Sequence, residues 1–156
     1  MVAGIMQSNG LTHLLDYGCG RNTSLLKGFQ KIKKELPNGF RYQAYDPGVP
    51  KYADQPIPAE LVCCIDVLEH IEPELLENVL DHLAELTEVL CFLTIHTGPA
   101  GKVLSDGRNA HLIQKPPQWW LPKLMERWTI QTFQLTQHGF WVIGHNEDLE
   151  IKAPQA

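Results

Sequence analysis

Four short apolar segments are each followed at once by a carboxylate or imidazole side chain. The segments are residues 11–15, 40–45, 61–65 and 89–95, and the residues that follow them are Asp16, Asp46, Asp66 and His96. Between them, apolar residues recur at helical spacing over 22–36 and 76–86. This alternation predicts an α/β fold with a mostly parallel sheet and helices on both faces. Because ligands bind at the carboxyl ends of such strands, the four polar residues are predicted to line one site.

The remaining segments complete a mixed six-strand sheet. Residues 47–58 contain four prolines and predict a loop with at most one helical turn. Residues 97–117 form a long polar connection, a kind of loop that is usually functional. Residues 119–128 predict a helix, and 129–135 with 140–143 predict an antiparallel hairpin that turns at His138-Gly139. A length of 156 residues suits a single domain, 1–156, with a core of about 11–145 and a tail at 146–156.

Composition narrows the function classes. The net charge of −5 gives no overall attraction to nucleic acid or to an anionic membrane, and neither is an expected partner. No apolar segment is long enough to cross a bilayer, and the N-terminal residues lack a secretory pattern. The cysteines show no CxxC spacing and are interpreted as buried apolar residues in a reducing compartment, which favours a cytoplasmic location. They are Cys19, Cys63, Cys64 and Cys91.

The first strand end continues into a turn with two glycines, Asp16-Tyr17-Gly18-Cys19-Gly20. Glycine lacks a Cβ, so the backbone at Gly18 and Gly20 can turn sharply and lie close to a ligand. The second strand ends at Asp46, whose carboxylate can accept hydrogen bonds from both ribose hydroxyls of an adenosyl group. The combination predicts an adenosyl cofactor rather than a plain tight turn. A nicotinamide dehydrogenase is disfavoured, because Thr23 stands where its fingerprint has a third glycine.

These segments resemble those of the class I S-adenosylmethionine-dependent methyltransferases. The matching residues are Leu14 to Gly20, Tyr45-Asp46-Pro47, Ile65 to Ile71 and the final hairpin, so that the resemblance covers about residues 11–145. It implies a Rossmann-like three-layer sandwich, S-adenosylmethionine as the cofactor, and methyl transfer as the activity. Three departures are expected: Asn22 in place of a third glycine, an N-terminal helix that is nearly absent, and one strand fewer than the usual seven.

The resemblance also implies which residues bind the cofactor. Gly18 and Gly20 would let the backbone approach its methionine part, and Asp16 would order that turn. Asp46 would hold the ribose, and Pro47 would border the adenine. The full expected set of cofactor-binding residues is Asp16, Tyr17, Gly18, Gly20, Asp46, Pro47, Asp66 and Val67.

A group of acids and histidines follows the third strand. Asp66-x-x-Glu69-His70 resembles the Glu-x-x-Glu-His metal motif of small-RNA 3′-terminal 2′-O-methyltransferases, and 108–111 resembles the loop that supplies their later histidine. A divalent metal held by Asp66, Glu69, His70 and His111 is therefore one alternative. A metal-free pocket is favoured, because many family members carry Val-Leu-Glu-His without a metal. The predicted catalytic residues are His70, His111 and Glu69, with an imidazole as the general base.

The long loop and the helix after it are expected to meet the methyl acceptor. Arg108 can pair with a carboxylate or phosphate, and Asn109 and Trp119 are the other predicted substrate contacts. The predicted function is methyl transfer to oxygen or nitrogen of a small or medium polar molecule. The alternatives are a metal-dependent 2′-O-methyltransferase acting on nucleic acid and a non-catalytic cofactor-binding module. Because the N-terminal helix that covers the cofactor in many family members is expected to be nearly absent, a homodimer is a further alternative.

Overall fold

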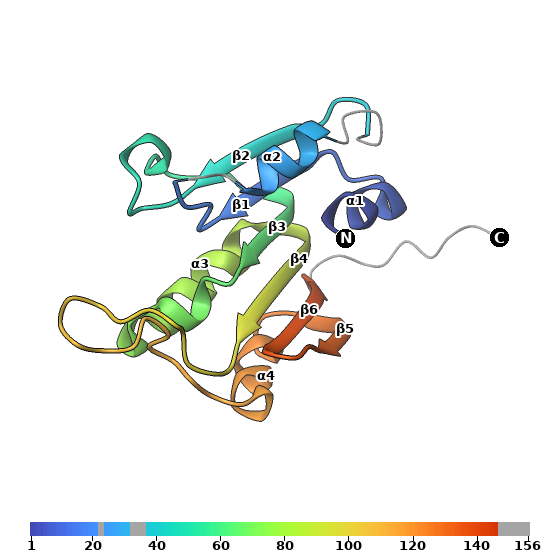
Figure 1. Cartoon of the computed structure of the whole chain (residues 1–156). Helices are drawn as coiled ribbons and strands as arrows, with labels where there is room; N and C mark the ends of the chain where they lie inside the picture. Colours follow the sequence, from blue (N-terminus) through green and yellow to red (C-terminus); the bar gives the residue numbers. More distant parts are fainter. Residues whose placement is uncertain (22–23, 32–36, 147–156) are drawn as a thin grey trace.

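The computed structural model describes residues 1–21, 24–31 and 37–146 (Figure 1). The predicted helix start at Asn22, the third-glycine position at Thr23, the apolar positions Ile32 and Leu36, and the predicted tail from 147 onward lie outside these residues. The strands are β1 His13–Tyr17, β2 Arg41–Tyr45, β3 Ala59–Ile65, β4 Thr87–His96, β5 Thr129–Leu135 and β6 Gly139–His145. The helices are α1 Val2–Asn9, α2 Ser24–Lys31, α3 Leu76–Leu86 and α4 Pro117–Met125.

The described strands form one six-stranded sheet in the order β2-β1-β3-β4-β6-β5. The strands β2, β1, β3 and β4 are parallel, whereas β6 is antiparallel to both β4 and β5. The chain runs from β1 outward to β2 and then returns to β3 on the other side of β1, so the strand order reverses there. A ligand crevice is expected outside the carboxyl ends of β1 and β3. The mostly parallel sheet, its antiparallel end and its missing strand are confirmed.

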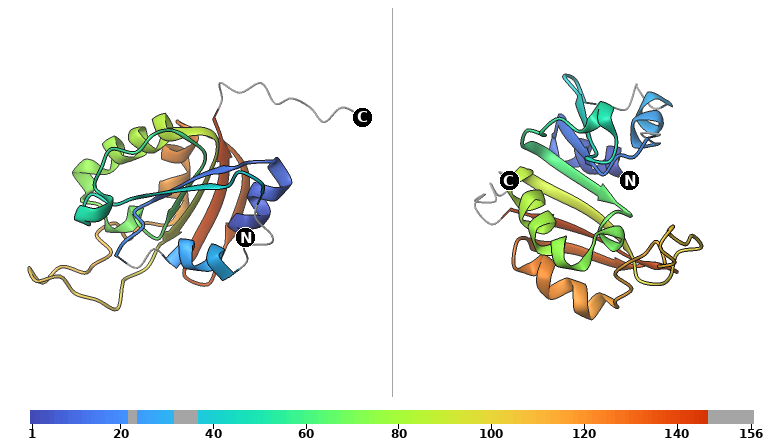
Figure 2. Two further views of the ribbon diagram at one scale, coloured as in Figure 1. Left: turned by 90° about the horizontal axis from the view of Figure 1, so that it is seen from above. Right: turned by 90° about the vertical axis from the view of Figure 1, so that its left-hand side faces the viewer.

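Helices cover both faces of the sheet, which gives the predicted three layers (Figure 2). Successive strand residues point to opposite faces. Leu15 therefore packs against the apolar faces of α3 and α4, whereas Leu14 packs against α1 and α2. The same division holds along β3 and β4, which explains why these strands are continuous apolar runs.

The segment before β1 forms one short helix, α1, which the sequence pattern does not predict. The helix α1 occupies most of the segment before β1, and Val2, Ile5 and Met6 are buried against the sheet face that α2 also covers. Three buried residues at helical spacing stabilise this short helix by tertiary packing, although Gly4 lies inside it and isolated helices of this length are marginal. Gly10 ends it in the left-handed conformation, at φ 66°.

The segment between β2 and β3 contains the predicted helical turn, a 3₁₀ turn at Pro50–Tyr52, and no strand. The predicted helix at 119–128 begins and ends earlier, as α4, because Pro117 fits the first helical turn.

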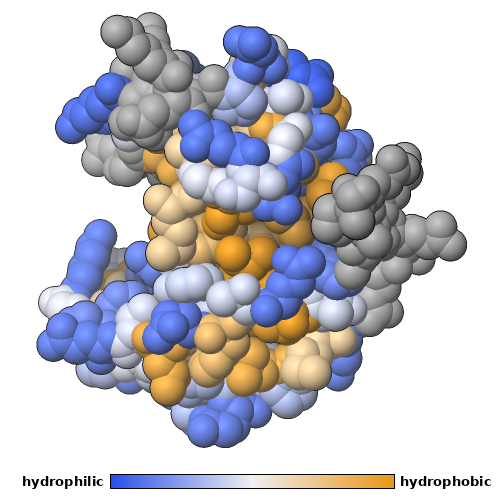
Figure 3. Space-filling model, turned by 90° about the vertical axis from the view of Figure 1, so that its right-hand side faces the viewer, coloured by the Kyte–Doolittle hydropathy of each residue, from blue (hydrophilic) through white to orange (hydrophobic). Residues whose placement is uncertain are grey.

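On the side of the molecule where α1 and β6 lie, apolar side chains gather around a hollow (Figure 3). Within the described ranges, no helix combines the length and apolar character needed to span a membrane.

Candidate functional site

A cavity of about 300 Å³ lies at the carboxyl ends of β1, β2 and β3, where the strand order reverses. We call it the β1–β3 cavity. Its size falls at the lower end of the range for small-molecule sites. It gathers six of the eight predicted cofactor-binding residues and the predicted catalytic residue His70. The lining residues are Tyr17, Gly18, Asp46, Pro47, Asp66, Val67, His70, Ile71 and Val79.

Gly18 packs directly against the segment that follows β3. Its φ of 75° lies in the left-handed region, and a Cβ built there would meet Val67 Cγ2 at 2.5 Å. The Gly18 N–H donates to the carbonyl of Tyr45 at 2.8 Å, which ties the turn to the end of β2. Gly20 also has a positive φ, 62°, but a Cβ there would meet nothing within 4 Å. Both glycines permit the turn, and at Gly18 the missing side chain also permits close packing.

Replacing Gly18 by alanine is expected to destabilise the protein more than replacing Gly20 by alanine. Both changes place a Cβ on left-handed backbone, at a cost of about 1–2 kcal/mol. Only the Gly18 Cβ collides with a β-branched side chain. Thermal unfolding of both variants measures the difference. The additional change Val67→Ala should recover part of the loss at Gly18 and none at Gly20, and equal losses for the two alanine variants would contradict the packing role.

Asp46 joins the glycine turn to the segment after β2. Its Oδ2 accepts the Gly20 N–H at 2.9 Å, and its Oδ1 accepts the Gly48 N–H at 2.9 Å. A carboxylate has about four acceptor positions, so both oxygens retain capacity for a ligand hydroxyl. The two backbone bonds fix the carboxylate at the wall of the β1–β3 cavity.

Asp16 lies beneath the turn and does not line the β1–β3 cavity. It is 5% exposed, and the Tyr42 hydroxyl donates a hydrogen bond to its Oδ2. Burial raises the pKa of Asp16, the nearby Asp46 carboxylate raises it further, and the Tyr42 hydrogen bond opposes both. Burial also raises the pKa of the Cys19 thiol in the turn, to about 11, so this thiol stays protonated at neutral pH.

Glu69 lies at the start of the connection from β3 to α3 and is 0% exposed. Its Oε1 accepts the backbone N–H of His96 at 3.0 Å, whereas Oε2 has no hydrogen-bond partner among the described residues. Burial raises the pKa of Glu69, and the Asp66 carboxylate contributes in the same direction. A buried acceptor without a partner is costly, so Oε2 is the Glu69 atom with capacity for a further hydrogen bond or a ligand.

Two histidines lie beside Glu69, with ring centroids 4.7 Å apart. His70 Nδ1 bonds to the carbonyl of Ala110, and His111 Nδ1 bonds to the carbonyl of Gly98, each at 2.7 Å. A carbonyl can only accept, so each Nδ1 carries a hydrogen, and Nε2 is the ring nitrogen left to act as a base or a ligand. The three side chains offer ligand atoms within 4.8 Å of one another. We call Glu69, His70 and His111 the Glu69 cluster.

Asp66 lies apart from this cluster. Its φ is 52°, unusual for a residue with a side chain, and its carboxylate accepts the hydroxyl hydrogen of Thr94 at 2.6 Å. The Asp66 N–H also points to Thr94, whose carbonyl accepts it at 3.1 Å. The structure therefore brings together three of the four residues of the predicted metal set and leaves Asp66 at the wall of the β1–β3 cavity.

Arg108 and Asn109, two of the predicted substrate contacts, bind other protein groups and so stabilise the conformation of the long loop. The Arg108 guanidinium binds both oxygens of Glu72 at 2.7 Å and Asp106 at 2.8 Å. Asn109 accepts the backbone N–H groups of Ala100 and His111, which positions His111. Substrate contact by either residue stays a prediction.

Trp119, the third predicted substrate contact, lies in α4. Its ring meets Trp120 edge-on at 5.1 Å, and Lys123 Nζ lies 5.0 Å from its ring centre. Trp120 is fully buried, so the two neighbouring tryptophans do differ in exposure, as adjacent residues on a helix should. Trp119 does not line the β1–β3 cavity, and its substrate role also stays a prediction.

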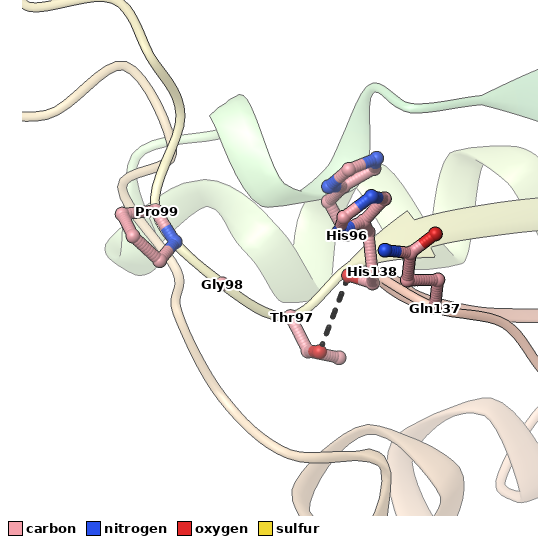
Figure 4. Close-up of a pocket in the computed structure, with 6 residues that line it drawn as sticks. All are labelled: His96, Thr97, Gly98, Pro99, Gln137 and His138. Atoms are coloured by element: carbon pink, nitrogen blue, oxygen red, sulfur yellow. Dashed lines mark hydrogen bonds between the residues drawn. The ribbon is translucent and has the colours of Figure 1, made fainter.

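A second cavity, of about 420 Å³, adjoins the Glu69 cluster at the end of β4 (Figure 4). We call it the histidine cavity, and its lining residues are His96, Thr97, Gly98, Pro99, Gln137 and His138. The sequence predicts His96 in one site with Asp46 and Asp66, but His96 lines this separate cavity. His138 is predicted only as part of a turn, and Gln137 is not singled out. The β4–β6 pairing places Gly139 opposite His96 and so carries His138 beside it. Without that register, no sequence signal identifies His138.

The comparisons with known proteins come from structure rather than sequence. No protein-family model matches the chain, and no curated protein matches it in sequence. The fold is similar to that of the 1,6-didemethyltoxoflavin-N1-methyltransferase of Burkholderia thailandensis, solved with bound 1,6-didemethyltoxoflavin and S-adenosylhomocysteine. The TM-score is 0.64 at 15% identity, over 94% of this chain and 76% of that one.

Two further solved structures share the fold. An O-methyltransferase family protein of Burkholderia thailandensis has a TM-score of 0.65 at 12% identity, over 93% of this chain and 55% of that one. The magnesium protoporphyrin IX methyltransferase of Synechocystis PCC 6803, with bound S-adenosylhomocysteine, has a TM-score of 0.55 at 16% identity, over 92% of this chain and 78% of that one. The chain thus has the fold of the class I methyltransferases.

Proposed function

We propose that this protein binds S-adenosylmethionine in the β1–β3 cavity and transfers its methyl group to oxygen or nitrogen of a small or medium polar acceptor. The observation that carries the proposal is the position of Asp46 and the glycine turn on one cavity, at the point where the strand order reverses. Solved proteins of this fold hold S-adenosylhomocysteine, and one of them holds its small-molecule substrate.

The lining of the β1–β3 cavity fits such a cofactor. The Asp46 carboxylate, fixed by two backbone N–H groups, offers acceptors for ribose hydroxyls. Pro47, Val67 and Ile71 offer apolar surface for the adenosyl and methionine carbons. Gly20 has open space where a side chain would lie, which leaves room for a ligand beside the turn.

S-adenosylmethionine supplies an activated methyl group, and the side chains of this chain have to align and deprotonate the acceptor. Alignment in a closed site supplies much of the rate, roughly 7–11 kcal/mol in well-oriented systems. The unprotonated Nε2 of His70 or His111 can take the proton of an acceptor hydroxyl or amine, a contribution of roughly 10²–10⁴-fold. His111 is 8% exposed, so its Nε2 works in a site with little water.

Isothermal titration with S-adenosylhomocysteine tests the proposal directly. Micromolar binding is expected, followed by formation of S-adenosylhomocysteine from S-adenosylmethionine with an acceptor from a panel of small hydroxyl and amine compounds. A folded protein that shows no heat of binding would overturn the proposal. Binding with no turnover for any acceptor would favour the non-catalytic module instead.

The Glu69 cluster favours a second candidate, methyl transfer assisted by a divalent metal. Oε2 of Glu69, which has no partner among the described residues, and the two imidazoles form a mixed carboxylate and imidazole donor set. The carbonyl groups that hold each Nδ1 are the outer partners typical of metal-ligating histidines. A metal there would orient an acceptor hydroxyl and lower its pKa.

For this candidate, titration of the protein with Mn²⁺ is expected to show saturable binding that His111→Ala weakens by at least about tenfold. His145→Ala is the matched control, because His145 lies on β6 and is not part of the cluster. Identical Mn²⁺ isotherms for His111→Ala and the unaltered protein would exclude the metal-assisted mechanism and leave the metal-free one.

A further inference from the structure

We propose that the histidine cavity binds an oxyanion, a carboxylate or phosphate group, that belongs to the methyl acceptor. The inference rests on the proposed function and adds to it the chemical class of the acceptor. His138 and Gln137, from the turn between β5 and β6, become residues that determine specificity.

The histidine cavity shares a wall with the Glu69 cluster. The Gly98 carbonyl at the cavity accepts the Nδ1 hydrogen of His111, and the rings of His96 and His111 are 5.3 Å apart. The His96 backbone N–H donates to Glu69. A molecule seated in this cavity therefore lies one ring away from the imidazole that we propose as a base, while His70 reaches the β1–β3 cavity on the other side.

The lining of the histidine cavity is rich in hydrogen-bond donors and contains no carboxylate. The imidazole rings of His96 and His138 are nearly parallel, at 9° between planes and 5.7 Å between centroids. Figure 4 shows the two rings standing side by side with the Gln137 amide next to them. The net charge of −5 gives no overall attraction to an anion, so binding of a negatively charged group here depends on these local donors.

These donors are free to bind a ligand. Neither imidazole ring has a hydrogen-bond partner in the part of the chain that the structure describes. The hydrogen bonds of His96 and His138 there are made by their backbone atoms. Thr97 donates to the His138 carbonyl at 3.4 Å, which fixes the turn without using the ring. Glu69 is fully buried and turns Oε1 to the His96 backbone N–H, so that oxygen does not compete for the rings.

An oxyanion fits this arrangement better than a neutral group. Each imidazole can donate a ring N–H, and an oxyanion has several acceptor positions, so one anion at the edges of the two parallel rings can accept a hydrogen bond from each of them. Carboxylate and phosphate share this chemistry, so the experiment has to separate them.

The test uses protein labelled with ¹⁵N-histidine and saturated with S-adenosylhomocysteine. Inorganic phosphate and benzoate are titrated in separate samples while the ring nitrogens are followed by NMR. We expect saturable shifts for His96 and His138 with at least one anion, and an affinity about tenfold weaker in His138→Gln, ~1.4 kcal/mol. A response to phosphate alone assigns a phosphorylated acceptor, and a response to benzoate alone assigns a carboxylated one.

The controls separate this inference from the proposed function. S-adenosylhomocysteine affinity is measured in every variant and is expected to be unchanged in His138→Gln. His145→Gln is the matched control substitution, and His96→Gln is a second variant of the histidine cavity. Retained cofactor binding with no saturable response to either anion, or an unaltered anion affinity in His138→Gln, overturns the inference. Absence of S-adenosylhomocysteine binding in the unaltered protein overturns the proposed function, and the assignment to an acceptor with it.

Discussion

Replacing Asp46 by alanine is expected to weaken S-adenosylhomocysteine binding by at least about tenfold, ~1.4 kcal/mol. The change removes a carboxylate that faces the β1–β3 cavity and also releases the N–H groups of Gly20 and Gly48. The variant therefore loses both the acceptors for the ribose hydroxyls and the bonds that hold the turn. Isothermal titration of the two proteins at the same pH and ionic strength measures the loss.

Two controls keep the Asp46 result interpretable. Asp54→Ala removes an exposed carboxylate from the same connecting segment and should leave the affinity unchanged. Asp46→Asn keeps the size and one carbonyl oxygen of the side chain, so it should keep more of the thermal stability than Asp46→Ala while still losing affinity. Equal affinities in the unaltered protein and in Asp46→Ala would remove the ribose contact and with it the main support for the cofactor site.

Replacing Glu69 by glutamine is expected to raise the thermal stability of the metal-free protein at neutral pH. The carboxyl group is fully buried, and one of its oxygens has no partner among the described residues. A glutamine amide keeps an acceptor for the His96 N–H, carries no charge and can donate to a neighbouring imidazole nitrogen. A gain of about 1 kcal/mol would shift the Tm by ~2–4 °C in a protein of this size.

The gain should depend on pH in a defined direction. Burial raises the pKa of Glu69 above its ordinary value of 4.5, so the folded state holds the proton more tightly than the unfolded state. The unaltered protein therefore loses stability as the pH rises from below 4.5 through the raised pKa, and Glu69→Gln should not. The Tm difference is expected to be largest at neutral pH and to disappear in acid.

Thermal scans from pH 4 to pH 8 in the presence of a chelator test this expectation. Glu85→Gln is the matched control, because Glu85 is an exposed carboxylate on α3. A lower Tm for Glu69→Gln at neutral pH would show that the carboxylate already has a stabilising partner. If the expected gain is found together with loss of Mn²⁺ binding, Glu69 is retained for its function at a cost in stability.

The sequence predicted the parts of the fold that depend on local pattern. Strands buried on both faces are continuous apolar runs, so β3 and β4 were found within two residues of their observed starts. The helix α1 was missed because it is held by contacts with β-strand side chains rather than by its own length or caps. The strand β1 begins two residues later than predicted, because Glu60 captures the N–H groups of Thr12 and His13.

The candidate site likewise contains some residues that local sequence pattern predicts and others that it does not. Gly18 and Asp46 follow strand ends, and the parallel sheet alone brings such residues together. The support of Asp16 by Tyr42 and the seating of His138 beside His96 depend instead on strand register, which pairs residues far apart in the sequence. The occupied guanidinium of Arg108 follows from the path of the long loop, which no local pattern fixes.

The place of the absent strand has a consequence for how chains of this fold can vary in length. In a sheet of this topology, the strand after β2 belongs at the outer edge, beyond β2, whereas the β1–β3 cavity lies near the middle of the strand order. Shortening at the edge removes one hydrogen-bonded ladder and leaves every strand end around the cavity in place. Strands can therefore be added or lost at the edge beside β2 without disturbing the β1–β3 cavity, whereas the loss of a central strand would remove part of the cavity wall.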